Sequence, residues 1–96
     1  MSGLSADMSI ESALGSVIRR IRKEMQLSQN DLALNSNLDR SYISQVESGK
    51  KNLTIVSLFN FANGLNVSPQ RILREVEALI AVNEHRSSRS QHFVEF

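Results

Sequence analysis

Two short helix patterns separated by a polar turn occupy residues 28–49, and this stretch constrains the fold more than any other part of the chain. Each pattern begins with a residue suited to cap a helix, Ser28 and Asp39, and each is apolar on one side only. Asn37, between them, tolerates the left-handed backbone of a tight turn, and Gly49 follows as a helix stop. We therefore predict two short helices joined by a tight turn.

The apolar residues of this stretch indicate how the two helices attach to a core. Leu32 in the first helix, and Ile43 and Val46 in the second, are spaced to face inward, and Leu38 anchors the turn. Asp31 stands three residues after the first cap, which approximates the spacing of a capping box. The remaining positions of the second helix are polar and are free to face outward.

One helix is predicted before this stretch and a largely buried one after it. The first begins at Ser9 or Ser12, and Gly15 within it is a weak point that costs about 1 kcal/mol against alanine in an exposed helix interior. The other begins at the cap Thr54 and stops at Gly64, which a leucine follows as in a Schellman motif. Their apolar positions are Leu14, Val17, Ile18, Ile21 and Met25 in the first, and Ile55, Leu58, Phe59, Phe61 and Ala62 in the other.

A fifth helix opens at Ser68-Pro69, a capping serine followed by proline at its favoured first position. One apolar stripe runs along this helix. We expect Ile72 and Leu73 in the monomer core, whereas the second half of the stripe extends beyond what a small core needs. We assign that half to a two-fold dimer interface, with completion of the core as the alternative. The interface residues are Val76, Leu79 and Ile80.

Length and composition favour one all-α domain. The chain has 96 residues, one proline, few aromatic residues and no cysteine, which excludes disulfides and thiolate metal sites and fits a bacterial cytoplasm. Residues 1–9 lack the features of a signal peptide, and the longest apolar run, residues 78–82, is far too short for a membrane span. We predict a flexible N-terminus at 1–9, the folded domain at 10–83, and a polar, flexible tail at 84–96 that ends in two phenylalanines.

The residues offer little support for an enzyme. Catalysis requires converging acids, bases or nucleophiles, and the only histidines, His85 and His92, fall in the predicted tail without a metal-ligand pattern. Gly49-Lys50 resembles a phosphate-binding loop, but that motif requires glycine at Ser44 and serine or threonine at Lys51. We expect no catalytic residue, no metal, no cofactor and no small-molecule ligand.

DNA binding is better supported, because the outward positions of the helix after Asn37 carry side chains suited to base edges. Arg40 can donate two hydrogen bonds to guanine, Gln45 can pair with adenine through two, and Ser41 is short enough for close approach. We predict that these three residues contact bases. The net charge is only +1, so whole-chain charge does not decide this point.

Contacts to the DNA backbone are expected on both sides of the three base-contacting residues. Ser28 and Gln29 lie at the start of a helix whose amides can receive a phosphate, and Ser44 lies on the outward face. A loop follows the helix that carries the base-contacting residues, and we expect it to bind the flanking DNA backbone; it consists of Lys50, Lys51 and Asn52. The first helix is also basic in its C-terminal half, and its cations are either a solvated face or lie near phosphates; they are Arg19, Arg20, Arg22 and Lys23.

The spacing from Gln29 to Glu47 resembles the phage-repressor and Cro-type helix-turn-helix, over about residues 12–73. The matching positions are Gln29-x-x-Leu32-Ala33, Asn37-Leu38, Tyr42-Ile43-Ser44 and Glu47-x-Gly49. The segments 37–44 and 52–55 are most similar to the controller proteins of bacterial restriction–modification systems. That resemblance implies a dimeric regulator that binds operators beside its own gene and the endonuclease gene, activating at one occupancy and repressing at a higher one.

The resemblance also implies individual roles. Arg40, Ser41 and Gln45 would face base edges, and the backbone contacts would be Gln29, Tyr42, Lys51 and Asn52. Glu47 would pair with Arg22 inside the domain. Tyr42 has a second interpretation, in which its ring simply packs at the surface. Asn37 departs from the family, since many relatives have glycine there, but asparagine adopts the same backbone.

These predictions describe a homodimer on double-stranded, pseudo-palindromic operator DNA in the nucleoid, with two dimers on adjacent sites and RNA polymerase as possible further partners. Other interpretations stay open. A prophage repressor or an antitoxin-type regulator would use the same fold on DNA. A helical protein–protein interaction module without DNA readout would belong to a different class, and it would show little salt-sensitive DNA affinity.

Overall fold

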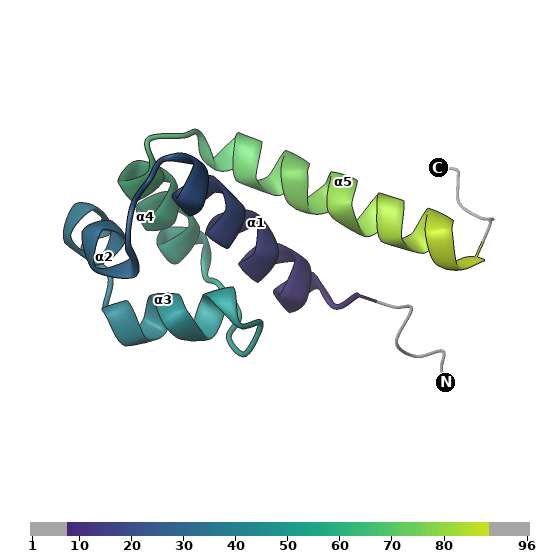
Figure 1. Cartoon of the computed structure of the whole chain (residues 1–96), viewed down its shortest axis with the longest axis horizontal. Coiled ribbons are helices and arrows are strands. Elements are labelled where there is room, and N and C mark those ends of the chain that lie inside the picture. Colours follow the sequence, from purple (N-terminus) through teal and green to yellow (C-terminus); the bar gives the residue numbers. More distant parts are fainter. Residues whose placement is uncertain (1–7, 89–96) are drawn as a thin grey trace.

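The computed structural model describes the backbone of residues 8–88 and the side chains of residues 8–84. This part of the chain contains five helices and no strand, so the predicted all-α class is confirmed. The helices are α1 (Ile10–Glu24), α2 (Gln29–Ser36), α3 (Arg40–Glu47), α4 (Ile55–Leu65) and α5 (Pro69–Ser88) (Figure 1). None of these helices is long and apolar enough to cross a membrane.

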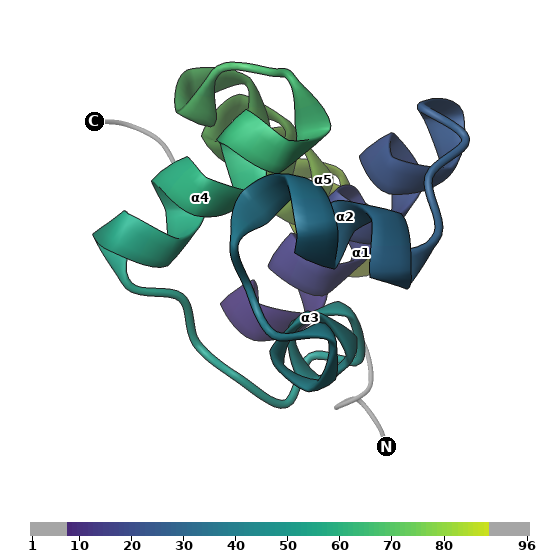
Figure 2. The same ribbon diagram turned by 90° about the vertical axis from the view of Figure 1, so that its left-hand side faces the viewer.

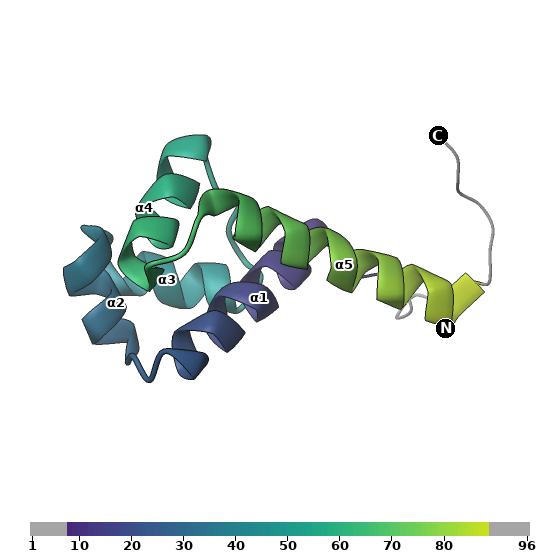
Figure 3. The same cartoon turned by 90° about the horizontal axis from the view of Figure 1, so that it is seen from above.

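Helix α1 separates α3 from α5. In Figure 1, α3 lies along one edge of the molecule, α1 lies in the middle and α5 lies along the other edge. Figure 2 looks nearly along the axis of α3 and shows this helix at the periphery, below the other helices. Figure 3 shows the C-terminal half of α5 extending past the rest of the helical body. The outer side of α3 is therefore open to a large ligand.

Local capping signals set the ends of α2 and α3. Ser28 Oγ accepts the Asp31 amide hydrogen at 2.9 Å, and Asp31 Oδ2 accepts the Ser28 amide hydrogen at 2.9 Å, which completes the capping box. Asn37 ends α2 in the left-handed conformation, with φ 63°, and Gly49 follows α3 with φ 79°. Asp39 occupies the N-cap position of α3 as predicted, but its side chain makes no capping hydrogen bond.

The predicted stop of α4 at Gly64 is wrong. The helix continues to Leu65, and Asn66 is the left-handed residue that ends it, with φ 60°. Gly64 lies inside the helix because α2 approaches closely there: an added Cβ would lie 2.7 Å from Ser36 Cβ and 2.8 Å from Leu32 Cδ1. The glycine therefore serves helix packing and not chain reversal.

Gly15 also serves packing, contrary to its prediction as an exposed weak point. It is buried where α1 crosses the end of α3, and an added Cβ would lie 2.3 Å from the carbonyl oxygen of Val46 and 2.6 Å from that of Glu47. No side chain fits into that space without moving backbone atoms. The glycine brings α1 against the C-terminal end of α3.

The core takes side chains from all five helices. Leu32, Ile43 and Val46 are completely buried, as predicted for the stretch around the turn. The other fully buried large side chains are Phe61, Ile18, Ile21, Leu65, Ile72 and Val17. Leu38 is half-buried against this core.

Several apolar residues lie elsewhere than predicted. Leu73 was expected in the core but is 52% exposed, and Val76 was assigned to an interface but is only 6% exposed within one chain. Helix α4 was expected to be largely buried, yet Ile55 and Phe59 are 69% and 57% exposed. The apolar residues of α4 cover more than one side of the helix, so a single core cannot bury them all.

Helix α5 continues to Ser88, so residues 84–88 of the predicted tail are helical. The histidines His85 and His92 and the two C-terminal phenylalanines lie outside the residues whose side chains the structure describes, as does most of the predicted flexible N-terminus.

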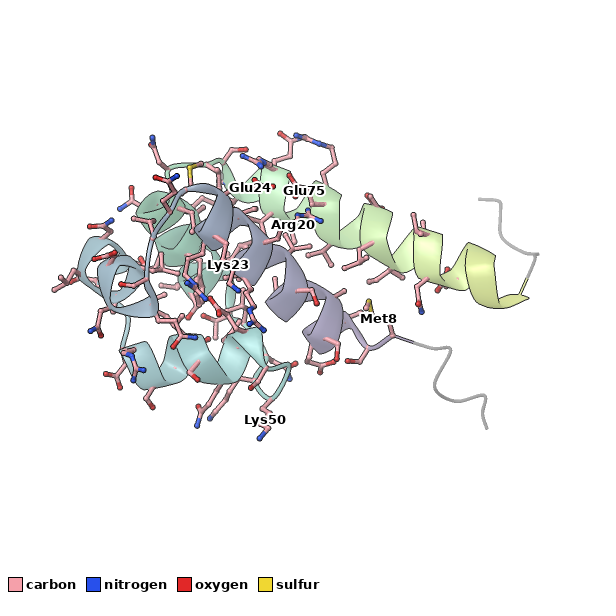
Figure 4. All side chains as sticks on the ribbon, viewed as in Figure 1. Met8, Arg20, Lys23, Glu24, Lys50 and Glu75 are labelled. Carbon is pink, nitrogen blue, oxygen red and sulfur yellow. The ribbon has the colours of Figure 1, made fainter. Side chains whose placement is uncertain are left out.

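An ion-pair network ties α1 to α5. Glu75 accepts hydrogen bonds from Arg71, at 2.7 Å, and from Arg20, and Arg71 also reaches Glu24 at 3.3 Å. Figure 4 shows Arg20, Glu24 and Glu75 together on the side of α1 that faces α5. The hydrogen bond from Arg71 is the main cause that holds the pKa of Glu75 below its ordinary value, and Arg20 adds to it against the opposing effect of burial.

Candidate nucleic-acid interface

The outward face of α3 is entirely polar. Ile43 and Val46 point into the core, and the exposed residues form a stripe on the opposite side of the helix. We call this stripe the α3 polar face; it consists of Arg40, Ser41, Ser44, Gln45 and Ser48. All three predicted base-contacting residues belong to it, and so does Ser44, a predicted backbone contact. Their side chains share one accessible surface of the kind that a major groove admits.

Tyr42 packs beside this face in the way its second interpretation describes. Its ring centroid lies 6.1 Å from that of Phe61, at an interplanar angle of 35°. Its hydroxyl donates a hydrogen bond of 3.3 Å to the Asn52 carbonyl oxygen. The residue remains half-exposed, so the packing does not occupy all of it. It links α3 to α4 and to the loop after α3, and its DNA-backbone contact stays a prediction.

A buried ion pair fixes α3 relative to α1 and α2. Arg22 Nε donates to Glu47 Oε2 at 2.6 Å and Arg22 Nη2 donates to Glu47 Oε1 at 2.9 Å, so the pair is bidentate. Arg22 Nη1 also donates to the Leu27 carbonyl oxygen at 2.9 Å. The side chains of the pair are only 10% and 5% exposed, and the hydrogen bond to Glu47 raises the pKa of Arg22. The structure thus contains the pair that the family resemblance implied.

The start of α2 is partly occupied by its own side chains. Gln29 Nε2 donates to Glu47 Oε1 at 3.1 Å, and the capping box uses both the amide and the hydroxyl oxygen of Ser28. The hydrogen bond from the Ser28 amide is the main cause that lowers the pKa of Asp31. Donors left for a phosphate are the backbone amides of Gln29 and Asn30, for which no acceptor is found in the described part of the chain.

Exposed cations follow α3. The Lys50 amide donates to the Gln45 carbonyl oxygen at 2.9 Å, which ties the loop to the end of the helix. The side chains of Lys50, Lys51 and Asn52 are exposed, and Figure 4 shows Lys50 projecting from the loop after α3. The predicted backbone-contacting residues of this loop therefore lie beside the α3 polar face.

A polar hollow of about 230 Å³ lies between α1, α2 and α3. Its lining brings together the buried pair, two predicted backbone-contacting residues, a second cation of α1 and one further serine of the α3 polar face; the residues are Arg19, Arg22, Gln29, Ser44, Glu47 and Ser48. The sequence interpretation grouped Arg19 with the other three cations of its helix. Its position three residues before Arg22 was the available signal, because residues at that spacing share a helix face.

The exposed apolar surface differs from the predicted interface. Leu79 and Ile80 are half-buried and pack against the core, whereas Val76 is part of the core itself. A hollow of about 440 Å³ lies among α1, α4 and α5, and the exposed side chains of Ile55 and Leu73 line it. We call the large exposed apolar residues of α4, together with Leu73 of α5, the α4–α5 apolar patch; they are Ile55, Val56, Phe59 and Leu73, of which Ile55 and Leu73 line the hollow.

Comparisons with known proteins agree with this geometry. A family model described as "Helix-turn-helix" matches residues 18–72. The control protein C.MunI of Mycoplasma sp is 33% identical over 69 residues, which are 71% of this chain and 93% of that protein. The wild-type restriction–modification controller protein C.Esp1396I is 40% identical with a TM-score of 0.71, over 78% of this chain and 99% of that one.

One further structure is informative about assembly. It is the C.Esp1396I tetramer in complex with its natural 35 base-pair operator, and it matches with 40% identity and a TM-score of 0.71, over 78% of this chain and 99% of that one. Each of these two matches covers 99% of the relative's solved chain, so the similarity extends along almost its whole length.

Proposed function

Since the chain belongs to the helix-turn-helix family, we propose that it is a sequence-specific DNA-binding transcriptional regulator of the restriction–modification controller type. The observation that carries this proposal is the α3 polar face. A helix buried through Ile43 and Val46 presents only polar side chains outward, at the periphery of the molecule (Figure 2).

Base readout is assigned to Arg40, Ser41 and Gln45. All three are exposed, and none has a side-chain hydrogen bond or ion pair within the described residues, so their donors and acceptors are available to base edges. Arginine reads guanine and glutamine reads adenine through paired hydrogen bonds. Ser41 contributes a short side chain that permits close approach.

Backbone contacts position the reading helix. We assign Lys50, Lys51 and Asn52 to one flank of the site, and the start of α2, through the Gln29 amide, to another. The Ser28 hydroxyl hydrogen is not used in the capping box and can donate to a DNA phosphate. Ser44 and Tyr42 are the remaining backbone contacts that we propose. Such contacts fix register without carrying sequence information. The bidentate pair of Arg22 and Glu47 fixes the position of α3 relative to α1 when DNA binds.

A second copy of the chain is assigned to the α4–α5 apolar patch. Contiguous exposed apolar surface on a small domain marks an interaction site, and one recognition helix reads too few base pairs to select an operator. Leu79 and Ile80 are half-buried against the core, and Val76 belongs to the core itself, so we do not assign Val76 to the interface. A two-fold dimer then addresses half-sites roughly 34 Å apart, or at a spacing set by the dimer.

Regulation follows from protein concentration. We propose that a first dimer activates transcription through RNA polymerase and that a second dimer on an adjacent site represses it. The tetramer that the relative C.Esp1396I forms on its operator supports adjacent occupancy. The described part of the chain contains no cluster of potential metal ligands, and the proposal requires neither a cofactor nor a small-molecule effector.

A nuclease footprint on the DNA just upstream of the chain's own gene tests the proposal. We expect two protected pseudo-palindromic segments that fill in order as the protein concentration rises. Protection of every sequence at the same concentration would contradict it. Genes for an endonuclease and a methyltransferase beside this one would support the controller assignment, and a toxin gene would support the antitoxin alternative.

A further inference from the structure

The four cations in the C-terminal half of α1 have different environments. Arg22 is buried in its pair with Glu47, and Arg20 is bound by the carboxylate of Glu75. Arg19 and Lys23 are exposed and have no ion pair among the residues that the structure describes. Figure 4 shows Lys23 on the side of α1 away from Arg20 and Glu75. Only the two unpaired cations are available to an external anion.

Of these two, Arg19 is the one that lies at the polar hollow beside α3. It lines the polar hollow together with Ser44 and Ser48 of the α3 polar face, whereas Lys23 does not. The close crossing at Gly15 explains this position, because Arg19 follows Gly15 by four residues and so lies on the same side of α1. Arg19 therefore lies on the face of α1 that contacts the end of α3, at the edge of the α3 polar face.

The charges of the hollow favour an anion. Glu47 is the only acidic residue in its lining, and the bidentate contact with Arg22 neutralises that carboxylate. Arg19 then leaves the hollow with a net positive charge. The planar guanidinium of Arg19 can donate two parallel hydrogen bonds to a phosphate group. Its long side chain can reach from α1 to a DNA backbone that lies beside α3.

We propose that Arg19 binds a DNA phosphate at the mouth of this hollow, on the flank of α3 that faces α1. The contact is independent of sequence and fixes the register in which the α3 polar face meets the bases. It gives α1 a direct part in DNA binding, in addition to its structural part through Arg22. The inference rests on the proposed function, since it requires DNA to lie against the α3 polar face.

The test is the salt dependence of DNA affinity for Arg19→Ala, with Arg74→Ala as the matched control. Arg74 is an exposed arginine on α5, on the other side of α1 from α3, and it has no ion pair within the described residues. Kd is measured by fluorescence anisotropy on the operator fragment and on a random fragment, between about 50 and 200 mM salt. One lost phosphate contact should reduce the slope of log affinity against log salt by roughly 0.9.

We expect Arg19→Ala to lose this slope increment and to weaken both fragments by the same factor, while Arg74→Ala matches the wild type. Arg19→Gln, which removes the charge but keeps a polar side chain, should lose the same increment and provides the same test should the alanine variant fold poorly, whereas Arg19→Lys, which keeps the charge, should retain the slope. A wild-type slope in a charge-removing variant, alanine or glutamine, that has a wild-type unfolding midpoint overturns the inference. A loss confined to the operator overturns it also, because it would indicate base readout. Absence of salt-dependent binding by the wild type would instead overturn the proposed function.

Discussion

Removal of the Glu47 carboxylate should be among the most destabilising single changes in this domain. In Glu47→Ala, the guanidinium of Arg22 stays buried and keeps one protein acceptor, the Leu27 carbonyl oxygen at 2.9 Å, after losing both of its bonds to the carboxylate. Gln29 loses its hydrogen bond as well. An uncompensated buried charge costs about 3–5 kcal/mol, against a total stability of roughly 5–15 kcal/mol for domains of this kind.

Urea unfolding at neutral pH, followed by circular dichroism, measures this loss directly. The matched control is Arg20→Ala, because the Arg20 side chain is 50% exposed and its pair with Glu75 should contribute at most about 1 kcal/mol. Glu47→Gln should lie between the two, since the amide keeps one acceptor for Arg22 but no charge. The double variant Arg22→Met with Glu47→Leu should recover most of the stability, because it removes both charges together.

The reasoning would be refuted by a loss below about 1 kcal/mol in Glu47→Ala, equal to that in Arg20→Ala. Such a result would mean that water reaches Arg22 freely once the carboxylate is gone. A double variant no more stable than Glu47→Ala would contradict the same reasoning from the other side. It would show that the space around the pair demands polar atoms and not only compensated charge.

Four further predictions concern DNA, assembly and pH. Arg40→Ala should lose about 1–3 kcal/mol of discrimination at one base position in a mutant-operator panel, and an equal loss on random DNA would count against base readout. Lys51→Ala should weaken all sequences similarly and flatten the salt slope, whereas altered specificity would exclude a pure backbone role. Phe59→Asp should convert dimer to monomer in sedimentation without unfolding, whereas Val76→Asp should unfold the core; a dimeric Phe59→Asp variant would disprove the proposed interface. The lowered pKa of Glu75 stabilises the fold fully above the ordinary value of 4.5, and this contribution disappears as pH falls through the lower folded pKa. Glu75→Gln should therefore lose stability at neutral pH and show a weaker decline in acid, and identical pH profiles would contradict the assignment.

The sequence predicted best what depends on neighbouring residues. The capping box of Ser28 and Asp31, the left-handed Asn37 and the glycine after α3 are local features, and all three occur as expected. Helical spacing correctly predicted which residues of α3 are buried. Ile43 and Val46 are the aliphatic residues of this helix, and their spacing puts both on the side that faces the core. The polar face opposite to them was predicted by the same periodicity.

Predictions failed where a residue's role depends on a distant helix. Gly15 and Gly64 each allow two helices to approach closely, which no local pattern reveals. Phe59 and Val76 are both apolar, yet the first is exposed and the second is buried, and helical periodicity alone does not show which apolar residues the core covers. The place of Arg19 beside α3 required the crossing of α1 over that helix.

The specificity ratio of the wild-type protein tests the central claim most directly. The claim is that the α3 polar face reads DNA sequence, and the measurement compares Kd for the DNA upstream of the chain's own gene with Kd for random DNA at one salt concentration. Specific regulators bind their sites about 10³–10⁷-fold more tightly than random DNA, and a ratio in that range is predicted here, with about 1–3 kcal/mol of this discrimination lost in Arg40→Ala. Equal affinity for the two DNAs would contradict the claim.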